Sequence, residues 1–180
     1  MLGKKLVRVV EGTRLSGIIV EVEAYRGFGD PASHAYKGKT ARNAVMFGEP
    51  GRAYVYLSYG VHQCLNLTCE PGGTPAAVLV RALEPLEGTD RMKVNRGISS
   101  LRELASGPGR LTEALAIGSD FDGEDLVTSD RLFLEEGERS VSVGTSSRIG
   151  VSTGTERRWR FFVRGCMFVS KGRTHVAQNP

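Results

Sequence analysis

The sequence has few of the residues that build disulfide frameworks or metal sites. Its 180 residues include three cysteines and three histidines. Cys64, Cys69 and Cys166 form no C-x-x-C pair, and the histidines are scattered, so no spacing typical of a zinc site occurs. An odd number of cysteines fits reduced thiols in a cytosolic-type compartment. We therefore expect no metal and no other cofactor.

Long apolar runs are also missing. No stretch is long enough to span a membrane, and residues 1–6 do not form a signal peptide. The composition, 40% apolar and 24% charged, is that of an ordinary globular chain. Since there is no internal repeat or linker, we expect one domain spanning residues 1–180.

Charge of one sign is not in large excess. Lysine and arginine number 24 against 20 acidic residues, which gives a net charge of +4 and a pI near 9.1. This mild basic balance permits a polyanionic partner without requiring one.

What the chain does have is an aromatic hairpin at residues 51–68. Two runs rich in aromatic and branched residues flank Tyr59-Gly60, a pattern typical of two strands and a tight turn. The period of two places Tyr54 and Tyr56 on one face and the small and aliphatic residues on the other.

Tyr59 would then lie at the tip of the hairpin, where packing stabilises a large aromatic side chain least. Turns favour glycine, asparagine or aspartate, so a tyrosine there needs an explanation. It either folds back onto its own protein or acts as a wedge between stacked bases, as in minor-groove binders.

Residues 15–25 predict a second strand, after a first at residues 5–10. Two carboxylates and a tyrosine on one strand face form either a solvated edge or a cleft wall that carries a general base. Alternation sends Glu21, Glu23 and Tyr25 to that face, and Ile18, Val20, Val22 and Ala24 to the opposite face, which should be core.

The next segments predict a loop, a short helix and a central strand. Residues 26–39 are polar and rich in glycine, and residues 40–47 resemble a helix with Thr40 as its N-cap. Residues 76–82 are almost wholly apolar, which indicates a central strand. Arg81 near the end of that strand requires a carboxylate or phosphate partner.

The second half of the chain gives weaker patterns. Residues 89–95 and 101–104 predict helices, and residues 106–116 predict a glycine-rich loop that enters a helix. Such a loop is either a phosphate seat or only a turn. Short strands are expected at residues 131–134, 141–143 and 159–163. The arginines at 157, 158 and 160 either face DNA or are solvated charges beside a core tryptophan.

Several of these motifs together resemble the alkyladenine (3-methyladenine) DNA glycosylase family. The resemblance runs in order from about residue 5 to residue 171, which makes it far more specific than a single motif. The matching segments are residues 21–25, 30–34, 42–47, 54–56, 80–88, 106–111 and 159–163.

The resemblance implies a single α+β domain with a curved antiparallel sheet, short helices and a β-hairpin that protrudes into the DNA minor groove. Glu23 would be the general base, and Arg81 would hold the nucleophilic water with it. Tyr59 would fill the space left by the extruded nucleotide. The residues implied to bind the extruded base are Tyr25, Ala32, His34, Tyr56 and Asn66. Those implied to contact DNA, besides Tyr59, are Thr40, Arg42, Met46, His62 and Arg110.

The function implied is base excision repair of alkylated or deaminated purines. The enzyme would be a monomer that binds damaged double-stranded DNA, in the bacterial cytoplasm at the nucleoid or in a eukaryotic nucleus. Because no lysine occupies a matched pocket position, it should hydrolyse the N-glycosidic bond without nicking the strand. The alternative is a lesion-binding protein that has lost catalysis, which is disfavoured because Glu23 and Arg81 are both present.

Overall fold

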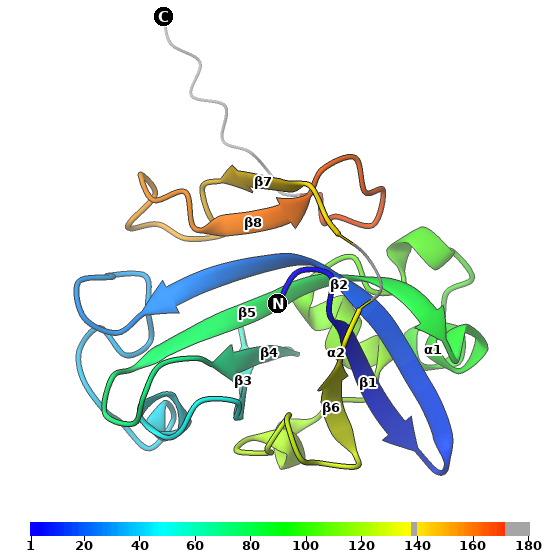
Figure 1. The fold of residues 1–180 in the computed structure, drawn as a ribbon, viewed down its shortest axis with the longest axis horizontal. Helices are drawn as coiled ribbons and strands as arrows, with labels where there is room; N and C mark the ends of the chain where they lie inside the picture. The colour runs from blue at the N-terminus through cyan, green and yellow to red at the C-terminus, as the bar shows by residue number, and fades with distance from the viewer. Residues whose placement is uncertain (138–139, 172–180) are drawn as a thin grey trace, which may run out of the picture.

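The fold of this protein is built around a curved antiparallel sheet (Figure 1), in a computed structural model that describes residues 1–137 and 140–171. Six strands follow the order β3-β4-β5-β2-β1-β6, and β8 joins through β2 and carries β7. Together with a few short helices, this confirms the predicted α+β class. The strands are β1 (Lys5–Val10), β2 (Thr13–Arg26), β3 (Ala53–Ser58), β4 (His62–Thr68), β5 (Ala76–Glu87), β6 (Leu132–Glu135), β7 (Val143–Ser146) and β8 (Arg160–Val163).

Strand β2 is the element that places the two glutamates. One edge of β2 pairs with β5 along its length, while its other edge pairs first with β1, through residues 13–18, and then with β8, through residues 21–23. The pairing with β5 shifts register on both sides of Glu21. Such a bulge lets one strand re-aim its side chains partway along its length.

The predicted alternation of β2 is wrong for its apolar residues, whereas Glu21 and Glu23 share a face as predicted, since both accept from Arg81. Ile18 and Val20 pack in a small cluster with Val163 and Phe168, whereas Val22 joins Ile19 in the largest core cluster. Ile18 and Val20 are thus separated from Val22, although all three were expected on one face. Glu21 and Glu23 are both 0% exposed, so the solvated-edge alternative is also wrong.

The helices are short and serve mainly to cover the sheet. Helix α2 (Pro108–Ala114) follows the predicted glycine-rich loop and buries Leu111 and Ala114 in the largest core cluster. The others are α1 (Thr89–Arg96) and the 3₁₀ turns η1 (Ala44–Phe47), η2 (Leu101–Glu103) and η3 (Ser119–Phe121). Among the described residues, no helix has the length and apolar character needed to cross a membrane.

The helix predicted over residues 40–47 is wrong in its first half. Only the 3₁₀ turn η1 forms, and it begins at Ala44. Thr40 is not an N-cap, because no helix begins there and the residue before η1 is Asn43. The backbone N–H of Thr40 donates to Asn43 Oδ1 at 2.6 Å. Asn43 is buried and donates in turn to the carbonyls of His34 and Gly38. Its side chain thus supplies hydrogen bonds to loop backbone groups that a helix would have supplied from the backbone.

Most other elements lie where the sequence predicts them, with shifted ends. Strand β1 matches its prediction, and β5 is central, between β4 and β2, but extends five residues further than expected, to Glu87. The strand expected at 141–143 begins at Val143 instead. The helix expected at 101–104 is reduced to η2, a single turn.

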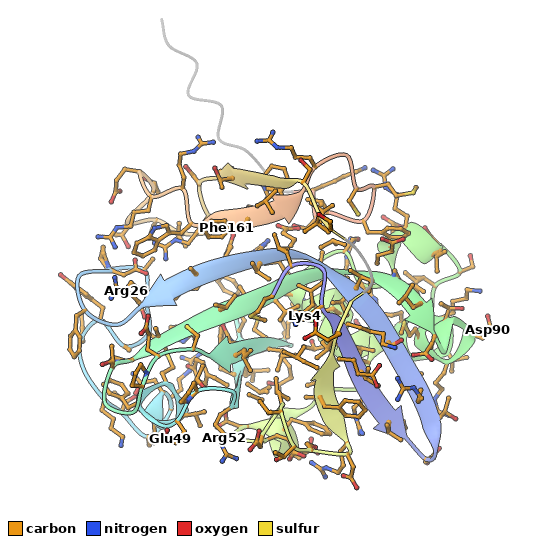
Figure 2. The ribbon with its side chains drawn as sticks, in the orientation of Figure 1. Lys4, Arg26, Glu49, Arg52, Asp90 and Phe161 are labelled. Atoms are coloured by element: carbon orange, nitrogen blue, oxygen red, sulfur yellow. The ribbon has the colours of Figure 1, made fainter. Side chains whose placement is uncertain are left out.

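The strands β7 and β8 form a layer against one side of β2 (Figure 1). Phe161 projects from β8 toward the sheet and packs on the largest core cluster (Figure 2). This layer brings residues from the last quarter of the chain beside the glutamates of β2.

Candidate active site

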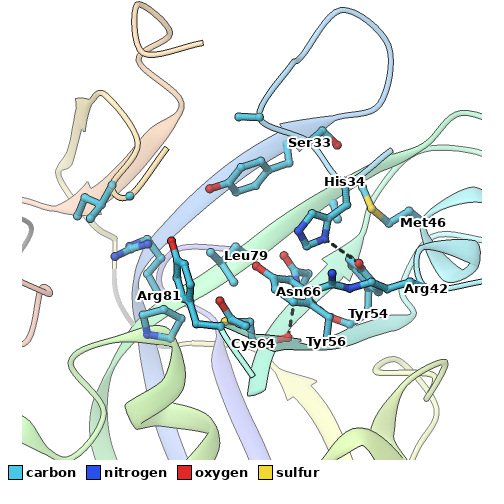
Figure 3. Close-up of a pocket in the computed structure, with 18 residues that line it drawn as sticks. Ser33, His34, Arg42, Met46, Tyr54, Tyr56, Cys64, Asn66, Leu79 and Arg81 are labelled. Carbon is cyan, nitrogen blue, oxygen red and sulfur yellow. Dashed lines mark hydrogen bonds between the residues drawn. The ribbon is translucent and has the colours of Figure 1, made fainter. Parts of the chain in front are cut away.

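A cavity of about 490 Å³ opens where the β3–β4 hairpin, β5 and two loops meet (Figure 3). Its size lies within the roughly 300–1,000 Å³ usual for small-ligand sites. The loops contribute residues 32–34 and 149–150. The lining comprises Tyr25, Ala32, Ser33, His34, Arg42, Met46, Tyr54, Tyr56, Ser58, Tyr59, Cys64, Asn66, Ala77, Leu79, Arg81, Pro108, Ile149 and Gly150.

Glu23 lies directly beneath this cavity. Its Oε2 accepts hydrogen bonds from the Tyr25 hydroxyl at 2.8 Å and from Arg81 Nη1 at 3.3 Å. Its Oε1 accepts from the backbone N–H of Ile149 at 2.7 Å. All three donors belong to residues that line the cavity, so Glu23 is joined to the cavity wall through its hydrogen-bond partners.

Arg81 has the carboxylate partner that its position in an apolar strand requires. Its Nε donates to Glu21 Oε1 at 3.0 Å, and its Nη1 reaches Glu23. Burial by itself would lower the pKa of Arg81, but the charges of Glu23 and Glu21 outweigh burial and raise that pKa.. The guanidinium is therefore a permanent cation held between two carboxylates.

Aromatic rings form one wall of the cavity. The rings of His34 and Tyr56 meet edge to face with centroids 4.5 Å apart, and His34 Nδ1 bonds to the Tyr54 hydroxyl at 2.9 Å (Figure 3). Burial, and then the nearby charge of Arg42, lowers the pKa of His34. Burial raises the pKa of Tyr54 to about 12 and also raises that of Tyr56, so this wall is uncharged near neutral pH.

Tyr25 is held by a buried ion pair. Arg148 forms two hydrogen bonds to the carboxylate of Asp30, at 2.7 and 2.8 Å, and both side chains are 0% exposed. The Arg148 guanidinium lies 4.6 Å from the centre of the Tyr25 ring and 5.3 Å from that of Trp159. Burial, reinforced by Glu23, raises the pKa of Tyr25, so its phenol keeps the proton that it donates to Glu23.

The remaining predicted base-binding residues also line the cavity. Ala32 and Asn66 are both part of it. The amide nitrogen of Asn66 donates to the Tyr54 carbonyl at 3.0 Å, which holds the side chain in place on β4. His34, Tyr56 and Tyr25 complete the predicted set, so the structure brings all five together.

The residues predicted to contact DNA are divided between cavity and surface. Arg42 lies 5.4 Å from the centre of the Tyr56 ring and donates to the Leu57 carbonyl at 2.9 Å. Met46 lines the cavity and is only 2% exposed, so it faces inward. Thr40 and Arg110 are exposed and lie outside the cavity lining.

The hairpin tip is the most exposed aromatic position in this region. Tyr59 is 90% exposed, so it does not fold back onto its own protein. A hydrogen bond from Val61 N to Ser58 O closes the turn, and Tyr59 and Gly60 both have positive φ, 49° and 72°. His62 begins the returning strand β4 and lies against Gly109, where an added Cβ would lie 2.8 Å from the Cβ of His62 and 2.9 Å from Cγ of its ring.

Part of the site was not predicted from the sequence. The backbone N–H of Ile149 and the side chain of Arg148 come from residues 147–154, a polar stretch with no periodic pattern. Nothing in that stretch alone indicates that it contacts Glu23. Cys64, by contrast, follows from the hairpin register, because it pairs with Tyr56 across the two strands.

One arginine near Trp159 fits neither predicted alternative, contact with DNA or solvated charge. Arg160 is 9% exposed and donates to Glu21 Oε1 at 2.7 Å, so it is neither solvated nor directed toward DNA. Within the described ranges, no group of three or more histidine, cysteine, aspartate or glutamate side chains is placed to hold a metal ion.

Comparison with known proteins shows the family of this chain. The profile of the methylpurine-DNA glycosylase family, "Methylpurine-DNA glycosylase (MPG)", matches residues 1–167. A protein of Chlorobium phaeovibrioides named "Putative 3-methyladenine DNA glycosylase" is 50% identical over 96% of this chain and 89% of its own length. Proteins with the same name from Koribacter versatilis and Methanocella arvoryzae are 49% and 48% identical, over 94% and 95% of this chain and 84% and 88% of their own lengths.

The matched region contains every residue of the cavity, and the relatives extend over nearly the whole chain. This chain belongs to the methylpurine-DNA glycosylase family.

Proposed function

We propose that the protein is a monofunctional DNA glycosylase that flips an alkylated or deaminated purine out of double-stranded DNA and hydrolyses its N-glycosidic bond. The observation that supports this most is the buried Glu23, bonded to Arg81 and Tyr25 beneath a cavity walled by aromatic rings. The protein would act as a monomer in base excision repair and leave an abasic site.

Base flipping follows from the chemistry of the target. An enzyme cannot reach the glycosidic bond of a stacked base, so it must extrude the nucleotide at a cost of a few kcal/mol. Stacking on aromatic side chains contributes about 1–3 kcal/mol per base, so a purine between Tyr25, His34 and Tyr56 would offset much of that cost. The exposed Tyr59 at the hairpin tip would occupy the gap left in the duplex.

Hydrolysis would use one carboxylate and one water molecule. A water molecule held by Arg81 Nη1 and Glu23 Oε2 would replace the direct contact of 3.3 Å between these two atoms. Glu23 takes a proton from the water molecule while the oxygen of that water bonds to C1′ of the deoxyribose. The electrons of the breaking C–N bond neutralise the cationic alkylated base, which leaves without a general acid.

The same residues argue against strand cleavage. Glycosylases that nick the strand need an amine nucleophile to form a Schiff base with the sugar. The cavity lining contains no lysine among the residues that the structure describes. Water is therefore the expected nucleophile.

The test is the variant Glu23→Gln, measured by release of free base from methylated duplex DNA under single-turnover conditions. Glutamine keeps the shape of the side chain but cannot take the proton, so base release should fall by about 10²–10⁴-fold while lesion binding persists. Glu11→Gln is the matched control, because Glu11 is an exposed glutamate at the β1–β2 turn, and it should excise at the wild-type rate.

Two outcomes contradict the proposal. A wild-type protein that binds lesion DNA but releases no base would be an inactive lesion-binding protein. A Glu23→Gln variant that excises at nearly the wild-type rate would show that Glu23 is not the general base.

A further inference from the structure

The second glutamate of β2, Glu21, is surrounded by donors. It is 0% exposed and accepts four hydrogen bonds. Arg81 Nε, Arg160 Nε and Ser170 Oγ donate to its Oε1, at 3.0, 2.7 and 2.8 Å, and Ser170 N donates to its Oε2 at 2.6 Å. Each carboxylate oxygen is therefore already bonded within the protein.

Glu21 is excluded from direct chemistry by its position. Neither glutamate lines the cavity, but the three residues that donate to Glu23 all do. Of the three residues that donate to Glu21, only Arg81 lines it. A base must reach the proton that it removes, and the one cavity-lining residue that Glu21 contacts is Arg81 itself. A role for Glu21 in the reaction must therefore pass through Arg81.

We propose that Glu21 is a positioning residue for hydrolysis, which fixes the Arg81 guanidinium so that Nη1 meets Glu23 and the water. This inference rests on the proposed function. The Nε of Arg81 is bonded to Glu21 and its Nη1 to Glu23, so the planar guanidinium is held at two points. With only one of these points fixed, the plane could rotate.

Charge balance supports the same role. Glu21 and Glu23 carry two negative charges, and Arg81 and Arg160 carry two positive charges. Without Glu21, Glu23 would be the one carboxylate left for Arg81 in this cluster. Arg81 would then pair fully with Glu23 and occupy the oxygen lone pairs that must accept the proton of the water.

The hydrogen bonds that surround Glu21 depend on tertiary structure. Arg81 comes from β5, Arg160 from β8, and Ser170 from the segment that follows β8. Glu21 and Glu23 are two positions apart on β2, so both point to the same face of the strand and reach the same guanidinium.

The primary test is Glu21→Asp, which keeps the negative charge but shortens the side chain by one methylene. We expect single-turnover excision to fall by about 10²-fold, because misplacement of a catalytic group by about 1 Å has an effect of this size. The dissociation constant for lesion DNA should stay within about twofold, since Glu21 contacts no ligand. The matched control is Glu87→Asp, because Glu87 accepts from Ser16 on the strand pair outside the cavity; it should leave excision unchanged.

A double-mutant cycle separates positioning from general destabilisation. In an Arg81→Met background, Glu21→Asp should cause no further loss of excision, because the residue through which it acts has gone. Additive losses would overturn the proposal, as would a Glu21→Asp variant that excises at the wild-type rate. A wild-type protein without base release would instead refute the proposed function, so the two failures are distinguishable.

A charge-balanced variant removes the remaining ambiguity about folding. Glu21→Gln alone leaves two buried arginines with one carboxylate and should lower the melting temperature. Glu21→Gln combined with Arg160→Gln removes one charge of each sign, so stability should recover while excision stays low. Recovery of excision together with stability would show that Glu21 only balances charge.

Discussion

At the scale of single residues, the site confines charge to a few groups. Burial lowers the pKa of His34 and raises the pKa values of Tyr25 and Tyr56, so the rings that would hold a base are neutral near pH 7. Neutral aromatic faces attract cations, with about 0.5–2 kcal/mol per contact. An N-alkylated purine carries positive charge, so this wall suits it better than an ordinary base.

The shifted pKa of His34 predicts a pH dependence of stability. Its folded-state pKa lies below the ordinary value of 6.5, so the unfolded chain binds more protons in this range. Stability should therefore be lost as the pH falls from about 7 through 6.5 toward the folded-state pKa. We expect His34→Gln to reduce the change in melting temperature between about pH 7.5 and about pH 5.5.

The control for this prediction is His62→Gln, a change at an exposed histidine outside the aromatic wall. The difference between the two variants isolates the part of the pH dependence that belongs to His34. A His34→Gln variant with the full wild-type slope would show that another group titrates in this range.

At the scale of elements, the β3–β4 hairpin carries backbone strain at its tip. Tyr59 has φ 49°, a region that large L residues rarely adopt and that costs roughly 1–2 kcal/mol. The turn residues of such a hairpin favour asparagine and glycine. A strained and exposed tyrosine contributes little to the fold, which is what a side chain kept for DNA would show.

The variant Tyr59→Asn tests this interpretation. Asparagine tolerates positive φ, so the free energy of unfolding should rise by up to about 1 kcal/mol. Single-turnover excision from duplex DNA should become slower, because nothing holds the nucleotide out. Excision from a single-stranded substrate, which needs no extrusion, serves as the internal control and should keep its rate. Unchanged flipping of a fluorescent ethenoadenine probe in the duplex would contradict the wedge.

At the scale of the whole molecule, one buried ion pair joins distant parts of the chain. Arg148 follows β7 and Asp30 follows β2, and their two hydrogen bonds fix the loops that carry Ile149 and His34, both of which line the cavity. Burial opposes ionisation of Asp30, but Arg148 more than compensates and lowers its pKa. The pair therefore holds the β7–β8 layer and the loop after β2 in one arrangement.

Asp30→Asn should destabilise the protein strongly. Removing one partner leaves the buried Arg148 charge uncompensated, which costs about 3–5 kcal/mol in comparable cases. Denaturant unfolding measures this loss. Asp90→Asn is the matched control, because Asp90 pairs with Lys93 on the exposed surface of α1, and it should leave the unfolding transition unchanged. If both variants lose the same free energy of unfolding, the buried pair contributes no more to stability than the surface pair.

The sequence by itself determined the features that depend on short-range pattern. Residues 51–68 form the predicted hairpin because alternation and a Tyr-Gly turn are local properties. The apolar run that contains Arg81 became the central strand β5, and its arginine found carboxylate partners. The family also followed from the sequence, because several motifs matched in one order.

Only the tertiary structure decided how β2 presents its side chains. A bulge shifts register where the partner on its second edge changes from β1 to β8, and strand alternation contains no sign of a change of partner. The same holds for the donors on Glu21 and Glu23 from Ile149, Arg160 and Ser170. These residues lie more than 120 positions from the glutamates along the chain, and a local pattern cannot report a contact formed only when distant strands pair.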